Sequence, residues 1–332
     1  MIFKNYLTEW LTTTKENVKY RTFITYESMV RKHIDRVLGS YEVAKLNEGV
    51  IKEFFESLSE NGNKKTGLGL SSGSIKLVER LLKLIFEALQ KQISSNRNPT
   101  IKNKDFSGII ERAKKKMSKA FIEMDKVHDM DAIFDKEAQS RIVNYCQTRG
   151  RRQDIGILIA LYTGLRLGEV LALQWSDIDF EKGLMKIHSS AYYGKANNST
   201  TYSFIDGTPK SRSSYRTVAL PNGLLELLID LKNTSLSKYI VARLDGKRIP
   251  THSYQYSFKQ ILKKCDITYG SFHTLRHTFA TRAIELGTDI KTVSDALGHQ
   301  NPAFTLNRYV HSTLDSKKSL ANKIMDTTTI AQ

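Results

Sequence analysis

The stretch HTLRHTFAT (His273–Thr281) carries the most information about the fold. Its spacing predicts a helix, because His273, Arg276 and His277 stand three and four residues apart and therefore share one helical face. The apolar residues between them pack on the other side. A helix that presents one arginine and two histidines together points to a functional site in the C-terminal half of the chain.

A second stretch, TGLRLGE (Thr163–Glu169), follows an apolar segment that we expect to be a helix. Gly164 is placed to end that helix, so that Arg166 lies at a turn. The glycines do not form a phosphate-binding P-loop, because no Gly-Lys-Ser/Thr follows them. Arg166 is therefore a candidate site residue on a turn after a buried helix.

A third stretch, LGHQNPAFTLNRYVH, begins at Leu297. Gly298 can end one helix, and the pair Asn301-Pro302 can begin another as N-cap and first helical residue. This arrangement places His299 at the junction and Tyr309 about two turns into the second helix.

Arginine and histidine in these stretches favour an anion site over a metal site. His273 and His277 stand at i and i+4 as in a zinc-binding helix, but Thr274 occupies the position of the general-base glutamate. Arg276 between them would repel a cation. A Gly-x-Ser-x-Gly nucleophile elbow is absent from the sequence. Two permanently charged guanidinium forks suit a phosphate, and a tyrosine beside them can act as a nucleophile if neighbouring groups assist it. Taken singly, each residue also has an ordinary structural explanation as an ion-pair partner, a core aromatic or a helix cap.

Composition agrees with a basic globular protein. The chain has 332 residues, 40% hydrophobic and 26% charged, with a net charge of +17. This length suits about two domains, and the apolar content excludes a mainly disordered chain. The longest nearly apolar run, Ile155–Leu165, is about half the ~20 residues that a membrane span needs. No export signal opens the sequence, and two cysteines make neither a disulfide framework nor a zinc site, so a reducing cytoplasm is expected.

Positive charge is spread over both halves of the chain, which indicates a polyanion contacted by both, with nucleic acid ahead of an anionic membrane. In the N-terminal half, periodicity predicts helices at residues 2–13, 21–38, 47–59 and 71–92. The last of these has a basic stripe of Lys76, Arg80 and Lys83. This stripe is a candidate DNA contact, with a simple solvated face as the alternative.

The C-terminal half mixes helices with short strands. Strands are predicted at residues 184–188, 201–206 and 215–220, and helices at 221–232 and 253–265. The turn-rich GTPKSRSS between the last two strands predicts a hairpin tip. The residues from 189 to 203 exceed what a minimal hairpin requires, and DNA contact is the one role that we expect for them. A charged stretch around residue 122 predicts the domain boundary, giving domains 1–122 and 123–332.

The order of the three motifs resembles that of the tyrosine recombinases, the phage and conjugative-transposon integrases. The likeness runs from about residue 130 to 325 through TGLRLGE, HTLRHTFAT and the LGH…Y box. It implies a mainly α fold with a small antiparallel β-sheet. Residues 1–122 would form a helical core-binding domain, and residues 123–332 a mixed α/β catalytic domain. Together they would make a C-shaped clamp on DNA.

The resemblance also implies roles for the motif residues. Tyr309 would attack the scissile phosphate, giving a 3′-phosphotyrosyl link and a free 5′-hydroxyl. Arg166 and Arg276 would hold the non-bridging oxygens and stabilise the five-coordinate transition state. Lys210 would protonate the 5′-oxygen; simple phosphate contact is its alternative, and Arg212 or Lys195 could take its place. No ATP, metal or other cofactor is implied.

Four further residues complete the implied site. His273 would assist proton transfer, and His299 would hydrogen-bond the phosphate. Glu169 and His277 would have structural roles, holding the catalytic residues in place without contacting the phosphate.

The implied partner is double-stranded DNA with inverted-repeat core sites, on which four protomers would exchange strands through a Holliday junction. Residues 314–325 would dock into a neighbouring protomer, and accessory DNA-bending or excision factors are possible partners; a membrane is not. We expect action in the bacterial cytoplasm, at the nucleoid.

Larger integrases of this kind carry an additional arm-binding domain, whereas here the predicted helices begin near Met1. Either the protein acts without arm sites, or the sequence is part of a longer chain. Two alternatives remain at this point, a type IB topoisomerase-like enzyme and a non-enzymatic DNA-binding regulator.

Overall fold

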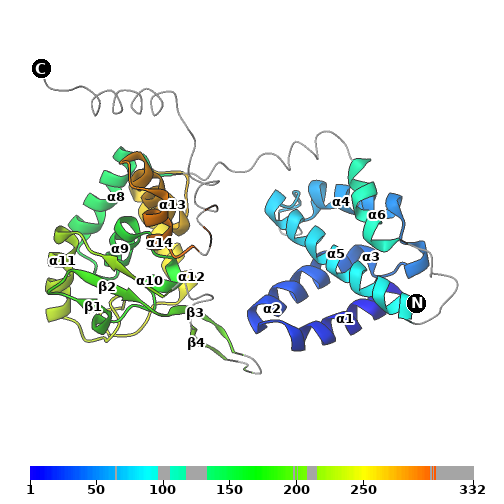
Figure 1. Ribbon diagram of the computed structural model, residues 1–332, viewed down its shortest axis with the longest axis horizontal. Coiled ribbons are helices and arrows are strands. Elements are labelled where there is room, and N and C mark those ends of the chain that lie inside the picture. Colours follow the sequence, from blue (N-terminus) through cyan, green and yellow to red (C-terminus); the bar gives the residue numbers. More distant parts are fainter. Residues whose placement is uncertain are drawn as a thin grey trace, which may run out of the picture. The chain divides into compact units, whose positions relative to one another are not determined.

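The computed structural model forms two compact units, Met1–Met130 and Asp131–Gln332 (Figure 1). We call them the N-terminal and C-terminal units. The structure describes residues 1–63, 66–95, 105–116, 133–196, 199, 201–207, 215–299, 301 and 303. The predicted boundary at residue 122 falls between 117 and 132, outside the described residues, and stays a prediction.

The N-terminal unit is built from helices, as the periodicity predicts. They are α1 (Phe3–Asn17), α2 (Tyr20–Met29), a π-helical turn (Val30–Ile34), α3 (Asp35–Leu38), a 3₁₀ turn (Val43–Lys45), α4 (Glu48–Asn61), α5 (Ser72–Ser95) and α6 (Phe106–Lys115). The long helix α5 packs against α4 and α6. Five apolar residues recur along it at intervals of three and four, which predicts one apolar stripe, and all five are buried: Ile75, Val78, Leu82, Ile85 and Leu89. One amphipathic helix therefore organises the core of this unit.

The C-terminal unit combines helices with short strands. Its helices are α8 (Lys136–Arg149), α9 (Ile155–Thr163), α10 (Leu167–Val170), α11 (Asn222–Asn233), α12 (Thr251–Lys264), α13 (Phe272–Glu285) and α14 (Ile290–Leu297), with 3₁₀ turns at Arg152–Asp154 and Trp175–Asp177. Its strands are β1 (Ile178–Asp179), β2 (Leu184–Ile187), β3 (Ser190–Lys195), β4 (Tyr202–Gly207) and β5 (Arg216–Ala219). The predicted fold class, mainly α with a small antiparallel β component, is confirmed.

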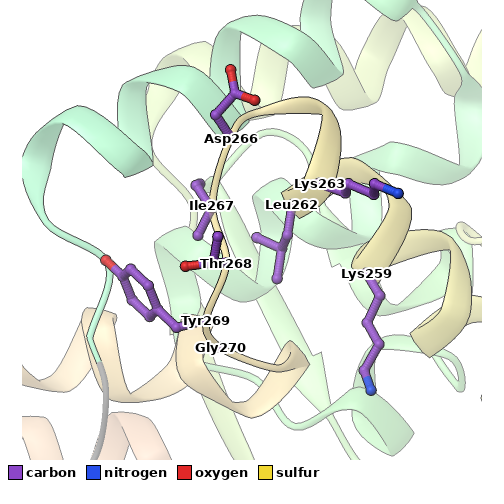
Figure 2. Close-up of a pocket in the computed structure, with 8 residues that line it drawn as sticks. All are labelled: Lys259, Leu262, Lys263, Asp266, Ile267, Thr268, Tyr269 and Gly270. Atoms are coloured by element: carbon purple, nitrogen blue, oxygen red, sulfur yellow. The ribbon is translucent and has the colours of Figure 1, made fainter.

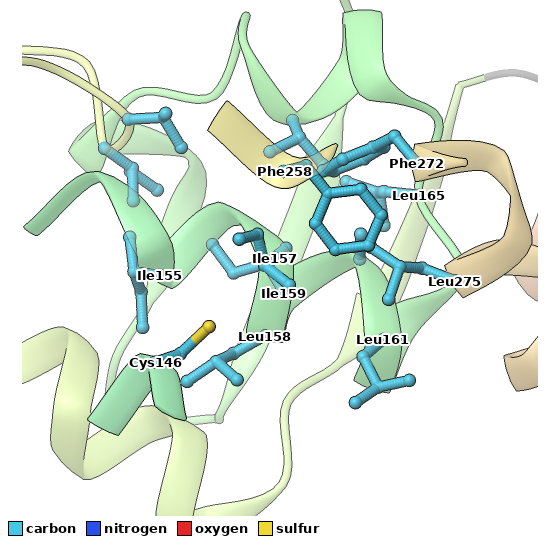
Figure 3. Packing of buried hydrophobic residues seen from close by; sticks show 14 of the residues in the cluster. Cys146, Ile155, Ile157, Leu158, Ile159, Leu161, Leu165, Phe258, Phe272 and Leu275 are labelled. Carbon is cyan, nitrogen blue, oxygen red and sulfur yellow. The ribbon is translucent and has the colours of Figure 1, made fainter. Parts of the chain in front are cut away.

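Helix α9 is the centre of the C-terminal unit. Eight of its residues, from Ile155 to Thr163, are buried, and it packs against α8, α10, α11 and α13. Figure 3 shows its isoleucines and leucines among Phe258, Phe272 and Leu275 of α12 and α13. A helix that is apolar all round belongs in a core, which explains why its sequence has no polar face. Within the described ranges, no helix is both long enough and apolar enough to cross a membrane.

The strands form two separate antiparallel sheets. The first has the order β1-β2-β5, with Leu184 opposite Ala219 and Ile187 opposite Arg216. The second is the hairpin of β3 and β4 alone. The prediction of a hairpin between residues 201–206 and 215–220 is therefore wrong, although the strands themselves are present. Turn residues mark a change of chain direction but do not specify which strands pair, and in the structure β5 pairs with β2 instead of β4.

Gly156 in α9 offers a test of this packing. A Cβ atom there would lie 2.5 Å from the Tyr254 hydroxyl and 2.8 Å from Val241 Cγ2. Gly156→Ala should therefore lower the free energy of unfolding by about 1–3 kcal/mol through overpacking, measured by urea titration. The control is Gly223→Ala in α11, where a Cβ meets nothing within 4 Å. That variant should be neutral or more stable by up to about 1 kcal/mol. Equal stability of the two variants would contradict the described packing.

Candidate active site

The candidate site begins at the end of α9. Gly164 ends this helix in the left-handed conformation, with φ of 67°. Residues other than glycine rarely adopt this left-handed φ. A Cβ atom at Gly164 would also lie 2.6 Å from the Phe279 ring and 2.8 Å from Leu297 Cδ2, so no side chain fits here. The turn then places Arg166 as the N-cap of α10, which confirms the turn that TGLRLGE predicts. Three sequence motifs therefore meet at one glycine.

Glu169 binds two arginines at once. Its carboxylate accepts hydrogen bonds from the backbone N–H and from Nη1 of Arg166, at 2.9 and 3.0 Å. The guanidinium of Arg216, on β5, donates to both carboxylate oxygens at 3.2 and 2.9 Å. The side chains of Glu169 and Arg216 are 5% and 6% exposed, whereas that of Arg166 is 39% exposed. Glu169 thus fixes a buried arginine on one side and an accessible one on the other.

The charge of Glu169 is maintained by these partners. Burial opposes ionisation of the carboxyl, but the hydrogen bond and charge of Arg216, together with those of Arg166, outweigh it. The pKa of Glu169 therefore lies below its usual range, and the group is a carboxylate at neutral pH. An ionised acceptor is what holds both guanidinium groups in place.

Arg276 joins the three motifs. Its residue is 1% exposed, and it lies in α13, as the spacing of HTLRHTFAT predicts. Nη1 donates to the Gly164 carbonyl at 2.8 Å, and Nη2 donates to the Leu297 carbonyl at 2.8 Å. Nη2 also lies 2.8 Å from Nε2 of His299. One guanidinium therefore connects the end of α9, the middle of α13 and the end of α14.

The guanidinium groups of Arg166 and Arg276 converge on the same acceptor. Arg166 Nη1 lies 3.4 Å from the Leu297 carbonyl oxygen that also accepts from Arg276. Arg216 reaches the neighbouring Ala296 carbonyl through Nε at 2.6 Å. Glu169 can neutralise one of these three positive charges. Arginines gathered so closely favour the binding of an anion such as a phosphate.

The histidines take two different positions. Arginine can only donate, so Nε2 of His299 must accept from Arg276, and the neutral ring carries its proton on Nδ1. On α13, the rings of His273 and His277 meet edge to face, with centroids 4.5 Å apart. His277 is buried, and His273 is exposed. His299 is therefore bound into the arginine cluster, while His273 faces solvent from the same helix as Arg276.

Sequence reasoning missed Arg216. It placed this residue in a strand but gave it no role, whereas the structure pairs it with Glu169 inside the unit. One signal was present: Val218, two residues along β5, is buried, so Arg216 is on the same face of the strand. An arginine on a buried face requires hydrogen-bond acceptors, and here Glu169 and the Ala296 carbonyl supply them.

Several predicted residues lie outside the described residues, among them Lys210, Arg212 and Tyr309, and their roles stay predictions. Asn301 does accept a hydrogen bond from the Ala303 N–H at 2.9 Å, as the predicted N-cap requires. Lys195, an alternative to Lys210, lies on β3 with its ammonium group 5.4 Å from the Tyr202 ring centroid.

The basic stripe on α5 is partly engaged in ion pairs. Lys83 pairs with Glu79 of the same helix at 3.1 Å and with Glu111 of α6. The hydrogen bond to Glu111 is the main reason that the pKa of Lys83 is raised. These contacts are those of a surface ion pair between two helices. The predicted contact of Lys76, Arg80 and Lys83 with DNA stays a prediction.

A pocket of about 610 Å³ lies elsewhere in the C-terminal unit. It is formed by the last turns of α12 and the loop to α13, and Figure 2 shows its lining residues: Lys259, Leu262, Lys263, Asp266, Ile267, Thr268, Tyr269 and Gly270. None of the predicted catalytic residues lines it. The arginine cluster, rather than this pocket, is the candidate active site. Within the described residues, no group of three or more His, Cys, Asp or Glu side chains is placed to hold a metal ion.

Comparison with known proteins identifies the family. Residues 132–315 match the model of the "Phage integrase family", and residues 2–59 match "Phage integrase, N-terminal SAM-like domain". The first match alone covers more than half of the chain. The chain therefore belongs to the phage integrase family of tyrosine recombinases and is, by class, a site-specific recombinase.

Relatives are similar along almost the whole chain. A "Tyrosine recombinase XerC-like" protein of Caldanaerobacter subterraneus subsp. tengcongensis is 28% identical over 328 residues, covering 93% of this chain and 78% of the relative. The ICEBs1 integrase of Bacillus subtilis is 24% identical, covering 98% and 83%.

Among solved structures, the Tn1549 transposon integrase in complex with transposon right end DNA has a TM-score of 0.75 at 20% identity, covering 98% of this chain and 100% of that one. A lambda integrase dimer bound to a COC′ core site has a TM-score of 0.65 at 16% identity, covering 93% and 96%. At these identities the likeness shows that the fold is shared.

The buried Glu169 gives a pH-dependent prediction. Glu169→Gln should lower the free energy of unfolding by about 3 kcal/mol at pH 7, because it leaves buried Arg216 without its carboxylate. The pKa of Glu169 is lower in the folded protein than in the unfolded chain, where it is about 4.3. Its contribution is therefore complete above the unfolded value and lost as the pH falls through the folded one. The difference between wild type and variant, measured by urea titration, should narrow below about pH 4.

The matched control is Glu285→Gln, since Glu285 forms an ion pair with Arg282 at a side-chain exposure of 49%. It should change stability by less than about 1 kcal/mol at any pH. A difference for Glu169→Gln that stays constant from pH 7 to pH 3 would contradict the ion-pair account.

Proposed function

We propose that this protein cleaves and rejoins strands of duplex DNA at a defined site, through a covalent bond between Tyr309 and the 3′ phosphate of the cleaved strand. One observation carries the proposal: the buried guanidinium of Arg276 bonds to Gly164, Leu297 and His299 and meets Arg166 at a shared carbonyl. These contacts bring together the residue types that a phosphodiester needs. The family membership supports the same reaction class.

The proposed reaction exchanges one phosphoester bond for another. The Tyr309 oxygen attacks phosphorus while its hydroxyl proton passes to His273, the bond from phosphorus to the 5′ oxygen breaks, and that oxygen takes a proton from Lys210. Rejoining reverses these steps when a 5′-hydroxyl attacks the phosphotyrosine. The bond energy is retained in the intermediate, so the chemistry requires neither ATP nor a metal ion. Arg166 and Arg276 stabilise the additional negative charge of the five-coordinate transition state.

The supporting residues act on the phosphate and its protons. His299 accepts from Arg276 through Nε2 and would hydrogen-bond a phosphate oxygen through its other ring nitrogen. His273 assists proton transfer from the exposed face of α13. Glu169 positions Arg166, the more exposed of its two arginine partners.

The proposed substrate is duplex DNA with inverted-repeat core sites, contacted by both units, with Lys76, Arg80 and Lys83 as the proposed phosphate contacts of the N-terminal unit. Four protomers would act together, with residues 314–325 docked in a neighbour. A tetramer of lambda integrase on a Holliday junction, a relative in fold, supports this assembly. DNA-bending or excision factors would assist the reaction, which would take place at the nucleoid in the bacterial cytoplasm.

The proposed nucleophile can be tested by covalent capture. Wild-type protein in EDTA is mixed with nicked duplexes from the DNA that flanks its gene, quenched with detergent and separated by electrophoresis. We expect a shifted band with wild type and none with Tyr309→Phe. The matched control, Tyr256→Phe on an exposed part of α12, should give the wild-type band. An adduct with Tyr309→Phe would contradict the assignment, and an adduct on every sequence alike would favour a topoisomerase. Binding without any adduct would favour a DNA-binding regulator.

Arg166 gives a second test of the site. Arg166→Ala should slow adduct formation by about 10²–10³-fold, because it removes a preorganised positive charge from the transition state. DNA affinity should change little, since one phosphate contact is lost among many. Both quantities can be measured on the same duplex, by single-turnover capture and by fluorescence anisotropy. Arg243→Ala, on an exposed turn before α12, is the control and should cleave at the wild-type rate. Cleavage at that rate by Arg166→Ala would mean that another arginine holds the phosphate.

A further inference from the structure

The hairpin of β3 and β4 is a part of the C-terminal unit to which the proposed reaction steps assign no residue. Its six residue pairs run from Ser190 opposite Gly207 to Lys195 opposite Tyr202. Figure 1 shows it projecting from the body of this unit. A two-stranded ribbon is marginally stable by itself, so contacts at its base must hold it.

Arg248, in the segment before α12, makes the principal contact at that base. Its guanidinium bonds to both carboxylate oxygens of Asp206 on β4, at 2.7 and 2.8 Å. The same guanidinium lies close to two aromatic rings, 4.3 Å from the centroid of Phe204 and 4.2 Å from that of Tyr239. The Arg248 side chain is 10% exposed. A two-pronged ion pair and two close aromatic rings fix the position of this group.

The same guanidinium also reaches the helix that carries the candidate site. Arg248 Nη2 donates to the Leu171 carbonyl at 3.1 Å, and Leu171 is the C-cap of α10. Strand β3 lies directly on α10: a Cβ at Gly168 would be 2.4 Å from Ser190 Oγ and 3.0 Å from the Ala191 carbonyl oxygen. The hairpin and α10 are therefore joined at two points, and Arg166 is the N-cap of α10.

The arrangement costs stability, which argues against a purely structural role. Among the described residues, the Nε–H of Arg248 is buried and has no acceptor. An unpaired buried donor is unfavourable, and the ion pair itself adds little net stability, because the Asp206 side chain is 47% exposed. What the guanidinium supplies, and an apolar side chain would not, is a directional link between Asp206 and the Leu171 carbonyl.

We propose that Arg248 is a positioning residue for DNA cleavage: it fixes the β3–β4 hairpin to the C-terminal end of α10 and so sets the pose of Arg166. This inference rests on the proposed function. Arg248 acts through α10 and does not contact the reacting phosphate. Its loss therefore slows the chemical step more than it weakens DNA binding.

Arg248→Lys is the main test, because lysine keeps the charge but cannot bond Asp206 in two places, contact two aromatic rings and reach the Leu171 carbonyl together. Adduct formation should slow by about tenfold, since small displacements of a catalytic group carry costs of this size. DNA affinity should stay within about threefold of wild type, as expected when no phosphate contact is lost. Asp206→Asn, a milder change that leaves the Leu171 bond in place, should give a smaller loss in the same direction. The control is Lys247→Ala, which removes only an exposed ion pair with Asp245.

A double-mutant cycle separates positioning from general loss of structure. If Arg248 acts through Arg166, then Arg248→Lys should slow cleavage about tenfold in the wild-type background and less than about twofold in an Arg166→Ala background. Equal losses in both backgrounds would overturn the inference, as would a wild-type rate for Arg248→Lys. Absence of an adduct with the wild-type protein itself would contradict the proposed function, and this inference with it.

Discussion

The buried guanidinium of Arg276 is the constraint on which the C-terminal unit depends. A charge at 1% exposure is tolerated only if its hydrogen-bond donors find acceptors. The acceptors here are carbonyl oxygens at the ends of α9 and α14, Gly164 and Leu297. Both helices must therefore end where they do, each at a left-handed glycine, Gly164 or Gly298. The turns that satisfy Arg276 are the same turns that deliver Arg166 and His299.

Glu169 and Arg216 connect α10 to strand β5 in a similar way. Their ion pair is buried, and such pairs add little net stability compared with apolar packing. What they provide is direction, because a carboxylate shared by two guanidinium groups fixes both. At the base of the β3–β4 hairpin the shared group is instead a guanidinium: Arg248 donates to both Asp206 and the Leu171 carbonyl. The candidate site is thus surrounded by arginines whose partners hold the backbone as well as the charge.

Much of this could be predicted from the sequence, because the signals are local. Apolar spacing predicts α5, the spacing of two histidines and an arginine predicts α13, and Gly164 and Gly298 mark helix ends that the structure confirms. Strand pairing was not predictable in this way: β4 was expected to pair with β5 but pairs with β3, since pairing depends on residues far apart in the chain. The roles of Arg216 and Arg248 were missed for the same reason. Their acidic partners lie 47 and 42 residues away.

The central claim, that Arg276 assembles the phosphate site by bridging three segments, is tested most directly by Arg276→Lys. The measurement is the single-turnover rate of adduct formation on a nicked duplex at saturating protein. A lysine keeps the positive charge but cannot reach the Gly164 and Leu297 carbonyls and His299 at once. The account predicts a rate at least about 10²-fold below wild type, with DNA affinity nearly unchanged. A rate within a few-fold of wild type would show that the charge suffices without the bridge, and would contradict it.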